Sequence, residues 1–333
     1  MCRHRNTGAR ADGRVSRRSR AGAEHMSENG GESRRRNATE GPGRSSPEVA
    51  EVLSLLAKER GLELRLVRRF ERGDEGAYEV VTPAGHALVL KWIPWSEAAA
   101  TAATATARRL ERLRGHGSPI PAQVASGRAG DVLFELQELA AGQPVQEVTE
   151  SVLEQLLAAV AAQRGAGLGT PEDWWEFLID GLFRDRTPLC RPSVLHGCTG
   201  PVEQLLRRLR KAALDVGPPR RVPDDVVHFD FGPANVLADR GRLTAILDWQ
   251  SCRDGDAGYD LVTTDWDLAA WPKAAPGVRE RLAQEIARTC DKGAVAGYAA
   301  HTVLRNLTWS YGTEWEEHIV RTGHAFLDRW ATG

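Results

Sequence analysis

The sequence of 333 residues lacks any apolar segment of the length that crosses a membrane. A membrane-spanning helix needs roughly 20 consecutive apolar residues, and uncharged runs here, such as Ala98 to Ala107, are far shorter. The chain begins with charged side chains instead of an apolar core, so no secretory signal is expected. We therefore expect a cytoplasmic protein with no membrane partner.

Cysteine and lysine are both scarce. The five cysteines are odd in number and form no Cys-x-x-Cys pair. This argues against a disulfide scaffold or a structural zinc site and favours a reducing cytosol. Only five of the 44 basic residues are lysines, so each lysine is a more informative position than usual.

The first 46 residues combine basic charge with an almost complete lack of large apolar side chains. Residues 1–46 hold 11 arginines and five acidic residues, whereas the rest of the chain has a net charge of −7. Such a segment cannot bury enough surface to offset its ordering entropy, so a disordered basic tail is predicted. An RNA- or membrane-binding arm is the alternative, but the interspersed acids favour the tail, and we do not expect a nucleic-acid partner.

Residues 47–139 are predicted to form a small β-lobe. A helical pattern follows Ser46-Pro47-Glu48 and ends at Gly61. Apolar runs between glycine-rich turns predict strands at 62–66, 77–81, 87–92 and 132–139, and a long helix is predicted over 97–114. This lobe is therefore mainly an antiparallel sheet with one long helix inserted.

Residues 140–333 are predicted to form a larger helical lobe. Apolar residues at helical spacing predict helices over 148–163, 174–183 and 202–214, and near 278–298, 300–310 and 314–330. One β-rich island interrupts them at 225–249. The predicted fold class is therefore α+β, with an antiparallel β-lobe followed by a helical lobe.

The island, VVHFDFGPANVLADRGRLTAILDWQ, carries three residues that point to chemistry. Asn235 begins one short strand and Asp248 ends the return strand, so a hairpin would bring their oxygens together. Carboxylate and amide oxygens are hard ligands suited to Mg²⁺. Asp230, in the loop just before, can orient an incoming hydroxyl or accept its proton.

At this point the sequence resembles the aminoglycoside phosphotransferase/choline kinase-like family, a branch of the protein-kinase-like fold. The family's catalytic loop, His-Gly-Asp-x-x-x-x-Asn, is matched by residues 228–235 except at Phe229. Asp248-Trp249-Gln250 is similar to its metal-binding Asp-Trp-Glu element, and residues 255–261 match Gly-Asp-x-x-x-Asp-Leu. Each element alone is a weak signal, but the ordered set indicates the family.

The resemblance implies a bilobal fold that binds ATP and Mg²⁺ and transfers the γ-phosphoryl group to a hydroxyl of a small molecule. It implies Asp230 as the catalytic base and Asn235 and Asp248 as metal ligands. His228 and Asp260 are expected to support the catalytic loop.

In the first lobe, Lys91 lies in an apolar strand pattern. In the family such a lysine contacts the α- and β-phosphates. The turn that contains Gly73 and Gly76 would cover the phosphates. Gln137 and Leu139 would offer main-chain groups to adenine.

The family often pairs the strand lysine with a glutamate of the following helix. Residues 98–107, in the middle of the predicted helix, contain no acid. Glu97 is then the best candidate for the partner of Lys91.

The acceptor is expected to be an aminoglycoside-like or other cationic or polar molecule. Tryptophans beside carboxylates suit such a molecule, which points to Trp174, Trp175, Trp266 and Asp265; the plain alternative is that these tryptophans belong to the core. Two other functions stay open. One is a metabolic kinase for a choline-, sugar- or homoserine-like acceptor, and the other is a catalytically inactive nucleotide-binding module that acts in regulation.

Overall fold

The computed structural model describes residues 47–70, 76–169, 173–219, 224–271 and 273–331. The predicted basic tail and Gly73 therefore lie outside the described residues. Within these ranges, no helix is both long enough and apolar enough to span a membrane.

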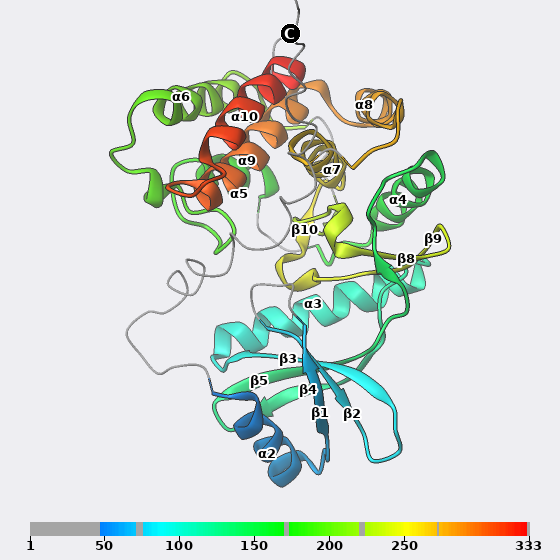
Figure 1. Cartoon of the computed structure of the whole chain (residues 1–333). Coiled ribbons are helices and arrows are strands. Elements are labelled where there is room, and N and C mark those ends of the chain that lie inside the picture. Colours follow the sequence, from blue (N-terminus) through cyan, green and yellow to red (C-terminus); the bar gives the residue numbers. More distant parts are fainter. Residues whose placement is uncertain (1–46, 71–75, 170–172, 220–223, 272, 332–333) are drawn as a thin grey trace, which may run out of the picture. The chain divides into compact units, whose positions relative to one another are not determined.

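The first five strands form one antiparallel sheet in the order β1-β2-β3-β5-β4 (Figure 1). They are β1 (Arg65–Arg69), β2 (Tyr78–Val81), β3 (Ala87–Pro94), β4 (Gln123–Ala129) and β5 (Val132–Glu138). Burial alternates along β3 and β5, so Leu90 and Phe134 pack with helix α2 (Val49–Arg60) in one small core. Lys91 belongs to the other face of the sheet.

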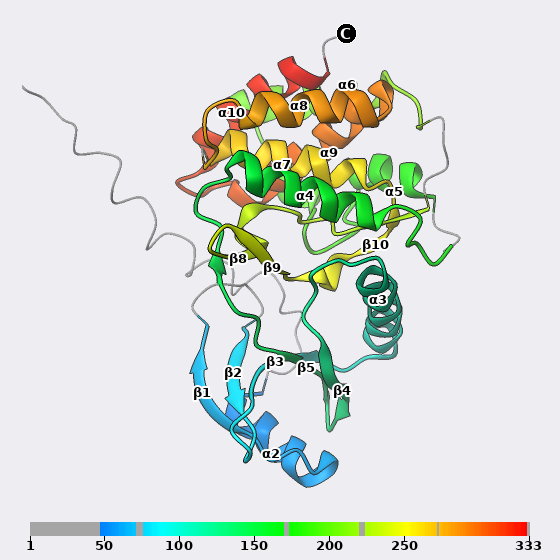
Figure 2. The same ribbon diagram turned by 90° about the vertical axis from the view of Figure 1, so that its right-hand side faces the viewer.

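Helix α3 (Glu97–Gly115) lies between this sheet and the helical lobe in both views (Figure 1, Figure 2). Its buried Leu110 and Leu113 belong to the core of the helical lobe. Arg109 Nε also lies 2.7 Å from Asp254 Oδ1, and both of these side chains are buried. The helix is therefore fixed to the larger lobe through its C-terminal half.

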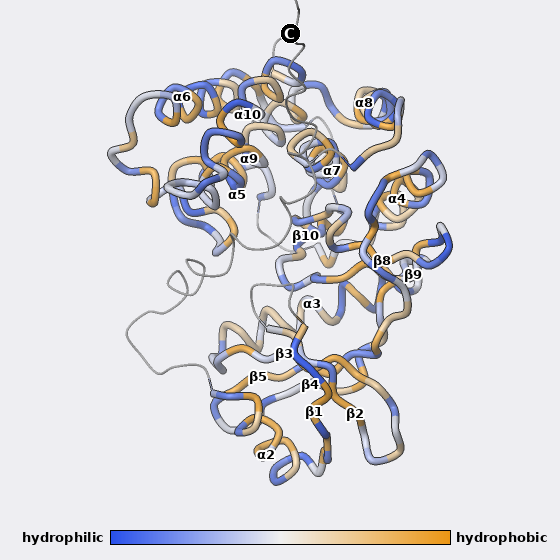
Figure 3. Tube along the Cα trace, in the orientation of Figure 1, coloured by the Kyte–Doolittle hydropathy of each residue, from blue (hydrophilic) through white to orange (hydrophobic). Residues whose placement is uncertain are grey.

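The helical lobe buries one large core. Its helices are α4 (Glu150–Gln163), α5 (Trp174–Gly181), α6 (Gly200–Leu214), α7 (Gly258–Ala270), α8 (Val278–Thr289), α9 (Lys292–Ser310) and α10 (Glu316–Trp330). Hydrophilic and hydrophobic residues share the turns of α6 and α10 (Figure 3). By contrast, α7 and α9 are buried along most of their length, so they form the centre of the lobe.

Two small sheets lie at the edge of the helical lobe that faces the β-lobe (Figure 2). One pairs β7 (Asp225–Val227) with β10 (Arg253–Gly255), and the other has the order β6-β8-β9, with β6 (Gln143–Pro144), β8 (Val236–Asp239) and β9 (Arg242–Ile246). The loop from β7 to β8 is the segment 228–235, so these strands fix both of its ends.

The structure confirms the predicted α+β class and corrects two details. Strand β4 was not predicted, because its sequence QVASGRA is small and polar and it lies at a sheet edge. The predicted helix end near 298 is wrong. The chain breaks at Asp291 instead, whose carboxylate accepts a hydrogen bond from the Gly293 N–H at 3.0 Å and so starts α9.

Candidate active site

The predicted hairpin brings Asn235 beside the end of β9. The Leu247 N–H donates to the Asn235 main-chain oxygen at 2.8 Å, one residue before Asp248. The Asn235 side chain donates through Nδ2 to the Asp230 main-chain oxygen at 2.9 Å and to Asp230 Oδ2 at 3.2 Å. With Nδ2 committed to Asp230, the amide oxygen is the atom left for a cation.

Lys91 and Asp248 connect the two lobes. Lys91 Nζ lies 2.9 Å from Asp248 Oδ1, and the two side chains are 21% and 42% exposed. Asp248 has a φ of 67°, a conformation that costs energy for any residue other than glycine and that occurs most often at functional sites.

The structure does not pair Lys91 with Glu97. Glu97 is exposed at the first turn of α3, and no ion pair of this residue occurs within the described part of the chain. The helix begins after Ser96, which caps it, so Glu97 lies at its N-terminus and not at its middle. The prediction of a Glu97–Lys91 pair is therefore wrong for this structure.

Asp260 and His228 hold the loop from its two sides. Asp260 accepts hydrogen bonds from the main-chain N–H groups of His228 at 2.7 Å and Phe229 at 3.0 Å, and from Gln163 Nε2 at 3.0 Å. Burial raises the pKa of Asp260 to about 7, although these three donors favour its ionised form. His228 is buried, with Nε2 2.7 Å from the Leu247 oxygen, and burial lowers its pKa.

Phe229 occupies the place where the family that the sequence resembles has glycine. Its φ is 77°, which explains why glycine is the common residue there. The ring stacks on Tyr259 at 5.3 Å with an angle of 10° between the planes. The guanidinium groups of Arg253 and Arg305 lie 5.0 and 4.9 Å from the ring centre. The buried ring thus offsets the backbone strain.

We expect Phe229→Gly to lower the free energy of unfolding by about 1–4 kcal/mol. Loss of a buried Phe side chain costs about 3–5 kcal/mol, and glycine recovers the roughly 1–2 kcal/mol of left-handed strain. Phe229→Ala loses the ring without that recovery, so it should be the less stable variant. Urea unfolding of both variants measures the difference, and an alanine variant as stable as the glycine variant would contradict the strain argument.

Arg305 of α9 reaches the loop 228–235 and was not predicted. Its Nη2 lies 2.6 Å from Asp230 Oδ1, and its Nη1 donates to the Phe229 main-chain oxygen. Burial acts to raise the pKa of the Asp230 carboxyl, but the charges of Arg305 and His228, together with the hydrogen bonds from Arg305 and Asn235, bring this pKa below its ordinary value. Asp230 is therefore ionised at neutral pH.

One face of α7 runs along the loop. Asp260, Thr264 and Asp267 recur at spacings of four and three residues, which places them on the same side of a helix. Thr264 Oγ1 donates to the Phe231 oxygen at 3.1 Å, and a Cβ at Gly232 would collide with the Asp267 carboxylate. Asp267 is, like Asp265, a sequence neighbour of Trp266, and its helical spacing from Asp260 is the signal that places it beside the loop.

Burial and, less strongly, the nearby charge of Asp230 raise the pKa of Asp267 to about 8. The charges of Arg305 and Lys273 act in the opposite direction. Asp267 is partly buried, and its carboxylate has no hydrogen-bond or ion-pair partner within the described residues. Asp267 is thus a carboxyl group beside Asp230 that no described residue of the protein binds through a hydrogen bond or an ion pair.

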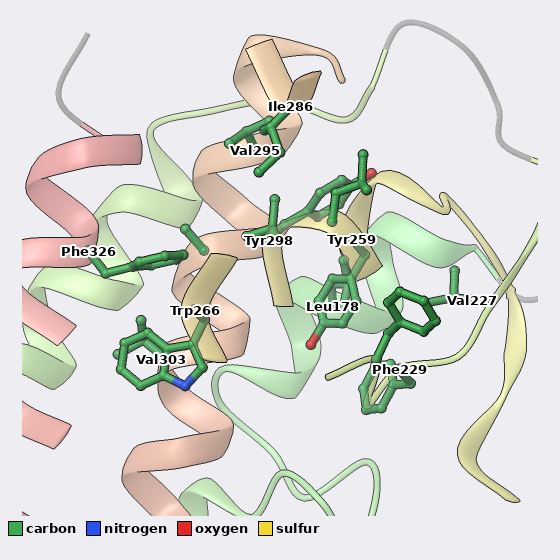
Figure 4. Packing of buried hydrophobic residues seen from close by; sticks show 14 of the residues in the cluster. Leu178, Val227, Phe229, Tyr259, Trp266, Ile286, Val295, Tyr298, Val303 and Phe326 are labelled. Carbon is green, nitrogen blue, oxygen red and sulfur yellow. The ribbon is translucent and has the colours of Figure 1, made fainter. Parts of the chain in front are cut away.

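Three of the four residues predicted for the acceptor pocket lie in the core. Trp266 is fully buried against Val303 and Phe326 (Figure 4). Trp174 is buried against Tyr259. Asp265 is fully buried, with Arg279 Nε at 2.8 Å. These side chains cannot line a pocket, so the prediction is wrong for them. Trp175 is only half-buried, and it packs on Tyr298 and the small Gly297.

The predicted role of Gln137, in the strand that leads into the connection between the lobes, also needs a correction. Gln137 lies inside the sheet, paired with Val89 on one side and Gln123 on the other, so its main chain is not available to adenine. Leu139 follows the strand and is exposed, and within the described residues its main chain has no hydrogen-bond partner. Gly76, at φ 69°, lies just before β2.

The oxygen atoms of the site that could bind a metal fit a cation that also binds a nucleotide. No group of three or more His, Cys, Asp or Glu side chains that could hold a metal occurs in the described ranges. Mg²⁺ is usually bound by only one or two protein oxygens together with phosphates and waters. The carboxylate of Asp248 and the amide oxygen of Asn235 are such a pair.

Comparisons with known proteins agree with this geometry. Residues 66–298 match the sequence pattern of the phosphotransferase enzyme family. Over 161 residues the chain is 30% identical to the hygromycin-B 4-O-kinase of Escherichia coli, an alignment that spans 43% of this chain and 46% of that relative. The chain thus matches about half the length of this curated relative.

Solved structures support the fold. A thermostable aminoglycoside phosphotransferase APH(4)-Ia, in complex with ADP and hygromycin B, superposes with a TM-score of 0.60 at 20% identity, covering 85% of this chain and 100% of that chain. An amicoumacin kinase in complex with AMP-PNP and Ca²⁺ superposes with a TM-score of 0.53 at 15% identity, covering 85% of this chain and 96% of that chain.

Proposed function

Because the chain belongs to the phosphotransferase enzyme family, we propose that it transfers the γ-phosphoryl group of ATP to a hydroxyl of a small cationic or polar acceptor. One observation carries the proposal. The structure assembles Asp230, Asn235 and Asp248 at the mouth of one hairpin, and Lys91 of the other lobe reaches the same place.

Each of these residues has a distinct task in the proposal. Lys91 binds the phosphates, and the main chain of Leu139 meets the base of the nucleotide. Asp230, kept ionised by Arg305, accepts a hydrogen bond from the acceptor hydroxyl and orients its oxygen toward the phosphorus. Asn235 and Asp248 would hold Mg²⁺, which when bound neutralises charge on the phosphates.

Asp267 lies on the side of the site where we expect the acceptor to bind. A carboxyl group beside the base and without a partner in the described part of the protein suits an ammonium group of the acceptor. The likeness to a hygromycin kinase supports an amino sugar as the first class to test.

At pH 9, where the Asp267 carboxyl is mostly ionised, we expect Asp267→Asn to raise the KM of a cationic acceptor about tenfold, the scale of one charge-assisted hydrogen bond, with little change in the KM of ATP. Since the pKa of Asp267 is raised to about 8, the carboxyl is mostly protonated at pH 7. An ammonium group favours the ionised form, so the acceptor KM should fall as the pH rises from 7 to 9. Steady-state kinetics over this range should show the dependence in the wild type and not in Asp267→Asn. Equal pH profiles would contradict the assignment.

The proposed function is tested by ADP release with MgATP over a panel of acceptors that includes aminoglycosides, choline, sugars and homoserine. Turnover on an amino sugar supports the proposal, and turnover only on choline, a sugar or homoserine supports the metabolic kinase. Nucleotide binding without turnover on any acceptor favours the regulatory module.

A further inference from the structure

A second carboxylate lies beside Lys91 in the sheet. Glu135 of β5 is the direct cross-strand neighbour of Lys91 in the pairing of β3 with β5. Residues opposite each other in an antiparallel pair share one face, with Cβ atoms about 4.5–5.5 Å apart. Leu90 and Phe134 occupy the other face, against α2. Lys91 and Glu135 therefore lie together on the face turned away from that core.

The Glu135 carboxylate has no polar partner among the described residues. The residue is half-buried, and this carboxylate makes no hydrogen bond or ion pair within the described residues. Glu135 is thus poised for a cation that reaches it in another state of the protein.

Lys91 needs a second partner when the nucleotide binds. It now contacts Asp248 at 2.9 Å, and Asp248 is also the proposed ligand for Mg²⁺. Once Asp248 has to serve the metal, its hold on the ammonium group weakens. The Ala/Thr-rich middle of α3 offers no carboxylate, and the buried residues of α3 belong to the other lobe.

We propose that Glu135 is the positioning residue that holds Lys91 on the nucleotide, so that Lys91 exchanges Asp248 for Glu135 when Mg²⁺ and ATP bind. The strand neighbour thereby replaces the helix glutamate that this chain lacks. This inference rests on the proposed function, because it assigns Asp248 to the metal and Lys91 to the phosphates.

The test is a double-mutant cycle on nucleotide binding, measured by calorimetry with MgATP and without an acceptor. Glu135→Gln should weaken binding by about tenfold or more, the scale of one charge-assisted hydrogen bond. In a Lys91→Met background the same change should have no further effect. Glu138→Gln is the matched control, because Glu138 lies on the same strand opposite Leu88 and is exposed; it should bind like the wild type.

Two further variants make the result decisive. Glu135→Asp keeps the charge and should recover most of the affinity, which a purely structural defect would not predict. Glu97→Gln should bind like the wild type.

The same exchange can be tested without nucleotide. In EDTA, a double-mutant cycle on thermal unfolding should find coupling between Lys91→Met and Asp248→Asn, and none between Lys91→Met and Glu135→Gln.

Wild-type affinity in Glu135→Gln, or an equal loss in the Lys91→Met background, would overturn the inference. A larger loss in Glu97→Gln would assign the partner to the helix after all. If the wild-type protein itself does not bind MgATP, the proposed function fails and not this assignment alone.

Discussion

Asp230→Asn is expected to lower turnover by about 10²–10⁴-fold, the usual weight of a positioned general base, and to leave MgATP binding nearly intact. Asp230 contacts Arg305 and Asn235, not Lys91. The amide has almost the same shape as the carboxylate, so the loop should keep its conformation. Turnover is measured by ADP release on an accepted substrate, and binding by calorimetry.

Asp248→Asn provides the contrast. Asp248 is paired with Lys91 and is the proposed metal ligand, so its loss should lower Mg²⁺-dependent ATP binding together with turnover. Titration of ATP with and without Mg²⁺ separates the two variants. If Asp230→Asn loses MgATP as strongly as Asp248→Asn, the assignment of the base is wrong. Wild-type turnover in both variants would contradict the proposed mechanism as a whole.

Arg305→Met should impair both stability and turnover. The guanidinium donates to the Phe229 oxygen, to Asp230 and, at 3.4 Å, to the Tyr259 hydroxyl. Each buried polar group left without a partner costs about 1–3 kcal/mol, so we expect a loss of about 2–4 kcal/mol in the free energy of unfolding. Turnover should fall at least tenfold, because Asp230 loses the charge that orients it.

Two controls distinguish the role of Arg305 from general loss of charge. Arg305→Lys keeps the charge but not the planar set of donors, so it should restore part of the stability and less of the turnover. Arg321→Met removes a side chain that is 70% exposed, on α10, and should change neither. Equal stability of Arg305→Met and the wild type, in urea unfolding, would refute the structural part of this prediction.

Local patterns predicted most of the fold and the hairpin of the site. Asn235 and the segment that ends at Asp248 are joined by a short turn, so their meeting follows from strand pairing alone. The resemblance added the order of the three elements. The sequence placed Lys91 on its strand. Its contact with Asp248, however, joins two residues that are 157 positions apart in the chain, and local sequence patterns do not predict contacts between residues so far apart.

The residues that were missed depend on how helices pack. Arg305 is the only Asp, Glu, Lys or Arg in residues 293–313, and a lone charge in an apolar helix is a signal for a buried partner. The partner itself, Asp230, cannot be read from α9. Trp174 and Trp266 were misplaced for the opposite reason. Neighbouring acids suggested a binding surface. The helices turn both rings inward and Asp265 pairs with Arg279, whereas Asp267 lies beside Asp230.

The attachment of α3 has a mechanical consequence. Since Leu110, Leu113 and Arg109 join this helix to the larger lobe, we expect α3 to stay with that lobe when the two lobes move relative to each other. The plane of sliding then lies between α3 and the sheet, and not at the chain connection after β5. Residues 98–107 of this helix are all alanine or threonine, and none of them is fully buried. Such short side chains interlock little with a neighbour. The stretch that lacks a glutamate would thus offer little resistance when the sheet, with Lys91 on it, shifts toward the nucleotide.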